Sequence, residues 1–71
     1  MKVYAKEIFR EVRIKKGFSI VDLAELVNMS KQAIGQIERR LNGVSPQKAK
    51  EILNAFEMEF DDVFELIDRG E

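Results

Sequence analysis

Apolar residues recur along the chain at the three- and four-residue spacing of amphipathic helices, and no segment shows the alternation of a half-buried strand. This pattern predicts a first helix over residues 3–16, which ends at Gly17. A second helix is expected over residues 20–27, with Ser19 as its N-cap and Asp22 completing a short capping box. The first third of the chain is therefore expected to be helical.

The third helix follows after a very short connection. Asn28 tolerates the left-handed conformation that ends a helix, and Ser30 can cap the next helix two residues later. So short a turn prevents antiparallel packing and makes the two helices cross steeply, which is the geometry of a helix-turn-helix. We expect this motif over about residues 19–40, with its second helix over residues 30–39.

The rest of the chain predicts two more helices. Ser45 followed by Pro46 places a cap before a proline at the first helical position. An acidic last helix is expected over residues 60–68, because its apolar positions are helically spaced and its first turn carries acids that suit the helix dipole. The predicted fold is all-α, a compact five-helix bundle forming a single domain over residues 1–71, near the lower size limit for one stable core.

The third helix has one apolar and one polar face. Ile34 and Ile37 lie on the apolar side. The opposite side carries Lys31, Gln32, Gly35, Gln36 and Arg39. A glutamine amide can bond to N6 and N7 of adenine, and lysine or arginine can reach O6 and N7 of guanine. An ordinary solvated helix face has the same composition, so this face alone favours neither interpretation.

Charge is distributed unevenly, although the net charge is only −1. Residues 1–50 contain eleven Lys or Arg and five acidic residues, whereas residues 51–71 contain one basic and eight acidic residues. This asymmetry indicates a basic face that meets an anion and an acidic end that lies away from it. Together with the tight turn, it favours nucleic acid as the partner.

Other classes of function find little support in the composition. The chain has no cysteine and no histidine, which removes the commonest metal ligands and thiol chemistry, so we expect no metal and no cofactor. Asp61 and Asp62 match the dipole of the last helix and do not form a catalytic pair, so no enzyme is expected. Apolar runs are too short for a membrane span and the N-terminal residues are charged, so a cytoplasmic protein is predicted.

Several motifs together resemble one family. These are Arg13 with Gly17, "LAEL" in the second helix, "MSKQAIGQIER" through the third, and "FEMEFDDVF" near the end, within residues 10–66. The span resembles the phage-repressor helix-turn-helix family of the Cro/C1 or Xre type, with its lambda-repressor-like DNA-binding domain. The resemblance implies a transcriptional regulator, expected to be a repressor, that places its third helix in the major groove of a palindromic operator.

The resemblance also implies roles for single residues. The base-reading positions are Lys31, Gln32 and Gln36. The positions near the DNA backbone are Ser30, Arg39, Arg40 and Asn42. Gly35 is expected beside the DNA backbone for a different reason, because its missing side chain allows the helix to approach closely. Arg13 and Glu38 match a pair that clamps the first helix to the third.

The chain departs from the family at several positions. Many relatives begin the second helix with a glutamine that binds phosphate, but this chain has Ile20 followed by Val21. Ile20 can therefore contact a protein or pack into the core. This leaves an alternative function, a protein-binding adaptor or antirepressor that uses Ile14, Ile20 and Val21.

Two glycines of the family are also replaced in this chain. Asn28 replaces one at little cost, and Glu57 replaces the other and would be strained in a left-handed conformation.

A homodimer is expected, because one monomer reads few base pairs. Leu66, Ile67 and the phenylalanines offer apolar surface, so the dimer contact is predicted to involve the fifth helix and the C-terminal tail.

Overall fold

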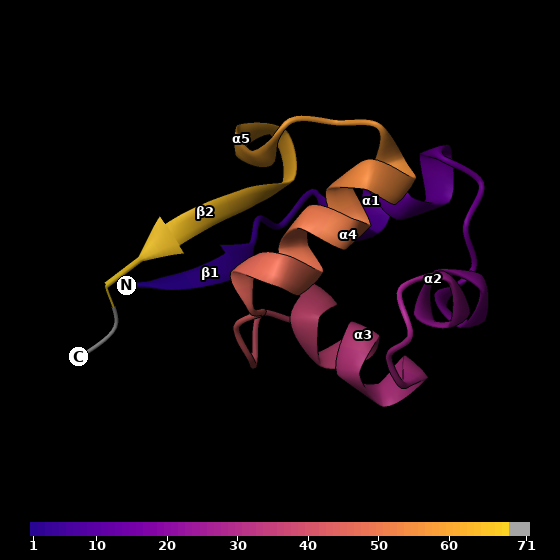
Figure 1. Cartoon of the computed structure of the whole chain (residues 1–71), viewed down its shortest axis with the longest axis horizontal. Helices are drawn as coiled ribbons and strands as arrows, with labels where there is room; N and C mark the ends of the chain where they lie inside the picture. The colour runs from indigo at the N-terminus through magenta and orange to yellow at the C-terminus, as the bar shows by residue number, and fades with distance from the viewer. Residues whose placement is uncertain (69–71) are drawn as a thin grey trace.

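The computed structural model describes residues 1–68, which form five helices and a small antiparallel sheet. In chain order the elements are β1 (Lys2–Ala5), α1 (Phe9–Lys15), α2 (Ile20–Leu26), α3 (Lys31–Glu38), α4 (Pro46–Phe56), α5 (Phe60–Val63) and β2 (Phe64–Ile67) (Figure 1). The two strands lie side by side at one end of the molecule, α2 lies toward the other end, and α3 lies beside α2 between them (Figure 1).

The three central helices begin where the sequence predicts. The hydroxyl of Ser19 accepts from the backbone N–H of Asp22 at 3.0 Å, and the Asp22 carboxylate accepts from the Ser19 N–H, which completes the capping box of α2. The hydroxyls of Ser30 and Ser45 cap α3 and α4 in the same way, at 3.1 and 3.2 Å. These caps depend on local sequence alone, which is why they could be predicted.

The sheet corrects the prediction of an all-α fold. Residues 3–5 were expected to begin the first helix, but residues 2–5 form β1 and pair with β2, with Lys2 opposite Ile67 and Ala5 opposite Phe64. Helix α1 starts only at Phe9. The pairing partner lies at the other end of the chain, so the apolar spacing of residues 3–16 gave no sign of it.

The fifth helix is also shorter than predicted. Only Phe60–Val63 is helical, and residues 64–67 of the expected acidic helix are extended as β2. A single helical turn is marginal alone, whereas an extended chain here hydrogen-bonds to β1. The backbone N–H of Lys6 also donates to the Val63 carbonyl at 2.8 Å, which continues the pairing beyond the strands.

Aromatic side chains form the centre of the core. The ring of Phe9 lies 5.6 Å from that of Phe56 and 5.9 Å from that of Phe64, measured between centroids, and all three side chains are fully buried. Ile34 and Ile37 of α3 are buried in the same cluster. The apolar face of α3 therefore fixes the helix to the core and turns its polar face outward.

Candidate nucleic-acid interface

The turn between α2 and α3 holds α3 at a defined angle to the core. Asn28 has a left-handed backbone, with φ of 58°, as its position at the end of a helix predicts. The N–H of Met29 donates to the Ala24 carbonyl at 2.8 Å, which closes the end of α2. Only three residues, 28–30, follow the C-cap of α2 before α3 begins, and the Ser30 hydroxyl is occupied as the cap of α3.

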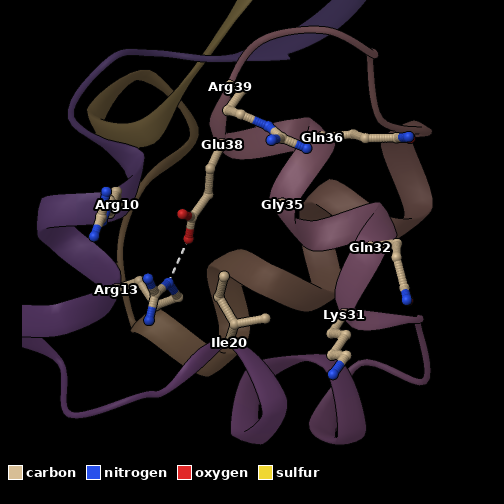
Figure 2. A pocket seen from close by; sticks show the side chains of 9 residues that line it. All are labelled: Arg10, Arg13, Ile20, Lys31, Gln32, Gly35, Gln36, Glu38 and Arg39. Carbon is tan, nitrogen blue, oxygen red and sulfur yellow. Dashed lines mark hydrogen bonds and ion pairs between the residues drawn. The ribbon is translucent and has the colours of Figure 1, made fainter.

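The polar face of α3 borders a hollow of about 490 Å³ between α3, α1 and the start of α2 (Figure 2). In Figure 2, α1 lies on one side of the hollow, α3 on the other, and Ile20 lies between them. The lining residues are Arg10, Arg13, Ile20, Lys31, Gln32, Gly35, Gln36, Glu38 and Arg39. The structure thus brings all three expected base readers to one surface.

A buried ion pair forms the back of this hollow. The Nε of Arg13 donates to Oε2 of Glu38, and each side chain is only 7% exposed. The Nη1 of Arg13 also donates to the Phe18 carbonyl at 2.7 Å. A buried pair is retained only when such extra hydrogen bonds offset the loss of water. Arg13 therefore connects α1, the turn before α2, and α3.

Positive charge dominates the hollow. Four cationic side chains and one carboxylate line it. Among residues 1–68 no ion pair engages Arg10, Lys31 or Arg39, and all three side chains are exposed. Their charges remain available to an anionic partner, whereas the charge of Arg13 is compensated by Glu38.

Arg10 is the residue of this surface that the sequence interpretation missed. It lies one helical turn before Arg13, so the two side chains share one face of α1. That spacing was the available signal, but it became meaningful only once the structure placed this face against α3.

Two other expected DNA contacts lie outside the hollow. Arg40 Nη2 pairs with Oε2 of Glu65 at 2.9 Å, which directs Arg40 toward β2. Asn42 lies in the loop after α3, and its Nδ2 donates to Oε1 of Gln36. The structure therefore joins a predicted backbone contact directly to a predicted base reader.

The three apolar residues of the alternative protein contact, Ile14, Ile20 and Val21, differ in how far they are buried. Ile20 is half-buried, packs against the core and also lines the hollow. Val21 and Ile14 are 49% and 57% exposed. Ile20 thus takes part in packing, which is one of the two roles left open for it.

Residues 1–68 contain no group of three or more aspartate, glutamate, histidine or cysteine side chains placed to bind a metal ion. Every helix in the same range is too short or too polar to traverse a lipid bilayer.

The hollow, the tight turn and the polar face of α3 all lie within the part of the chain that matches a known family. The family model described as helix-turn-helix, of the Cro/C1 or Xre-like type, matches residues 9–63. No curated protein matches the chain. The chain belongs to this helix-turn-helix family of DNA-binding transcription regulators, which are generally not enzymes.

Proposed function

We propose that this member of a DNA-binding family is a sequence-specific repressor that reads double-stranded DNA with α3 in the major groove. The observation that carries the proposal is the arrangement of α3, whose apolar face is buried while its polar face meets the cations of α1 across an open hollow. A helix held in this way can enter a groove about 12 Å wide without unfolding any other element.

Lys31, Gln32 and Gln36 are the proposed base readers. Lys31 and Gln32 lie in the first turn of α3 and are exposed, so their side chains are accessible to a base edge. Each well-placed bidentate contact between such a side chain and a base discriminates by roughly 1 to 3 kcal/mol.

The proposed backbone contacts surround these readers. The start of α3 at Ser30 presents backbone N–H groups that suit a phosphate. Gly35 allows close approach, and the exposed guanidinium of Arg39 adds charge beside it. The side chain of Arg40 keeps 34% of its surface exposed while it pairs with Glu65. The same guanidinium can therefore contact a phosphate while it keeps its ion pair with Glu65.

We also propose a homodimer that binds a palindromic operator in the cytoplasm. The expected fifth helix offers less surface for the dimer contact than predicted, because Val63 and Phe64 are fully buried in the monomer. Leu66 is 56% exposed, and within residues 1–68 the outer edge of β2 has no strand partner. A second copy could pair along that edge. The end of the expected C-terminal tail, residues 69–71, lies outside the described residues.

The protein-binding alternative is not favoured. It requires Ile14, Ile20 and Val21 to form one accessible patch, but Ile20 packs against the core and borders the hollow. The remaining two exposed side chains are isolated apolar residues of a kind that many soluble proteins carry.

Selection of bound sequences from random duplex DNA tests the proposal. The native chain should enrich a palindromic motif, and Gln32→Ala and Gln36→Ala should each lose preference at defined positions of it. Asn54→Ala, which changes an exposed amide on α4, should leave the motif unchanged. Absence of enrichment by the native chain would contradict sequence-specific binding. A motif unaffected by both glutamine substitutions would contradict reading by α3.

A further inference from the structure

Gln36 differs from the other proposed readers because its amide group is already engaged. The Nδ2 of Asn42 donates a hydrogen bond to its Oε1. That contact uses one of the two lone pairs of Oε1, turns this end of the amide toward Asn42, and leaves the Nε2 group, with its two N–H donors, directed away from Asn42. Figure 2 shows the Gln36 side chain extending from α3 on the side away from Arg10.

The loop that carries Asn42 is itself fixed to the sheet. The N–H of Val44 donates to the Val3 carbonyl at 2.8 Å, and Val44 forms an isolated bridge with Val3. A β-carbon on Gly43 would lie 2.9 Å from that same carbonyl oxygen, so the loop approaches β1 as closely as a glycine permits. On the other side of Asn42, Arg40 is tied to Glu65 of β2. The position of Asn42 therefore does not depend on Gln36.

We propose that Asn42 is a positioning residue that sets the base preference of Gln36. The inference rests on the proposed function, in which Gln36 reads a base. A freely rotating glutamine amide presents either end and is well suited to adenine, which offers one acceptor and one donor. With Oε1 held by Asn42, Gln36 presents its N–H donors, and these suit the two acceptors of guanine, N7 and O6. The loop anchored to the sheet thus selects which chemical group the recognition helix shows to the DNA.

Substitution of Asn42 should change the preference at one position of the operator. In Asn42→Ala the amide of Gln36 is released, so the preference for guanine should fall by about 2- to 12-fold, the range for one net hydrogen bond. In Asn42→Asp the new carboxylate accepts from Nε2 and turns Oε1 outward. This variant should favour cytosine or adenine, whose amino groups are donors.

The experiment is selection from random duplex DNA by the native chain, Asn42→Ala, Asn42→Asp and Gln36→Ala. The last variant identifies the base pair that Gln36 reads. Asn54→Ala and Asn54→Asp make the same chemical changes on an exposed part of α4 and should leave the motif unchanged. Thermal unfolding of every variant establishes that it is folded. Because Asn42 is exposed, its substitution should shift the midpoint little.

The results separate the inference from the function on which it rests. The inference is supported if, at the Gln36 position alone, the preference for guanine falls in Asn42→Ala and is replaced by cytosine or adenine in Asn42→Asp. A preference that changes in Gln36→Ala but not in either Asn42 variant overturns it and leaves the proposed function intact. A uniform loss of affinity in the neutral variant Asn42→Ala, with an unchanged motif, also overturns it, since Asn42 would then be a backbone contact. If the native chain enriches no motif, the proposed function fails, and the inference fails with it.

Discussion

The guanidinium of Arg39 lies over Gly35, and its Nη2 is 4.0 Å from the point that a β-carbon on Gly35 would occupy. The two residues are separated by one helical turn on the polar face of α3 (Figure 2). Apart from the two neighbouring residues and the backbone of the same helix, no other atom of residues 1–68 comes as near to that point. The glycine is therefore not required by packing within the monomer, although it weakens the helix.

Gly35→Ala should make the protein more stable and bind DNA less tightly. The alanine fits without a clash and raises the free energy of unfolding by about 1 kcal/mol, because glycine is a poor helix former. Its methyl group would protrude on the face that approaches DNA. Urea unfolding and titration with operator DNA measure the two effects separately. Affinity equal to that of the native chain would show that Gly35 does not serve close approach.

Glu38→Ala should destabilise the protein strongly. Removing the carboxylate leaves the Arg13 guanidinium buried with only the Phe18 carbonyl as a partner, and such a loss costs about 3 to 5 kcal/mol. Chemical denaturation provides the measurement. The exposed ion pair of Glu11 with Lys15 is a matched control, since Glu11→Ala should cost at most about 1 kcal/mol. Similar losses in both variants would mean that burial does not strengthen the Arg13–Glu38 pair.

Glu57→Gly should stabilise the protein without affecting DNA binding. Glu57 ends α4 with φ of 58°, where a β-carbon is unfavourable by about 1 to 2 kcal/mol. Glycine removes that strain, so the unfolding midpoint in urea should rise. Asn28→Gly provides the comparison, because asparagine already tolerates its φ of 58° and should gain less. An equal gain in both variants would contradict the assignment of strain to the glutamate.

Features set by neighbouring residues could be predicted from the sequence, whereas those set by distant residues could not. The caps at Ser30 and Ser45 and the left-handed backbone of Asn28 depend on a few adjacent positions, and the sequence predicts them. For Glu57 the sequence predicts only that a left-handed backbone would be strained, and the structure shows that backbone. The left-handed backbone of Arg40, with φ of 60°, was missed because an arginine gives no local sign of it.

Pairing between residues far apart in the sequence accounts for the larger errors in the predicted fold. The strands β1 and β2 form only together, so neither carries a complete signal in its own apolar spacing. The same limit applies to the candidate site. The polar face of α3 was evident from the sequence, but the facing cation of α1 and the hydrogen bond from Asn42 to Gln36 required the folded chain.

Arg10→Ala should weaken DNA binding uniformly across sequences and reduce its dependence on salt. Arg10 is exposed on α1 and borders the hollow. In the same hollow, Ile20 stands where the resemblance to related proteins leads us to expect a phosphate-binding glutamine. The guanidinium of Arg10 can therefore supply a phosphate contact from the neighbouring helix. Loss of one such contact should lower the slope of log affinity against log salt by about 1, with the preferred motif unchanged. Titrations at several salt concentrations measure this slope, and Lys50→Ala removes an exposed charge of the same sign on α4 as the control. Equal slopes for Arg10→Ala and the native chain would place Arg10 outside the DNA contact, and an altered motif would make it a base reader instead.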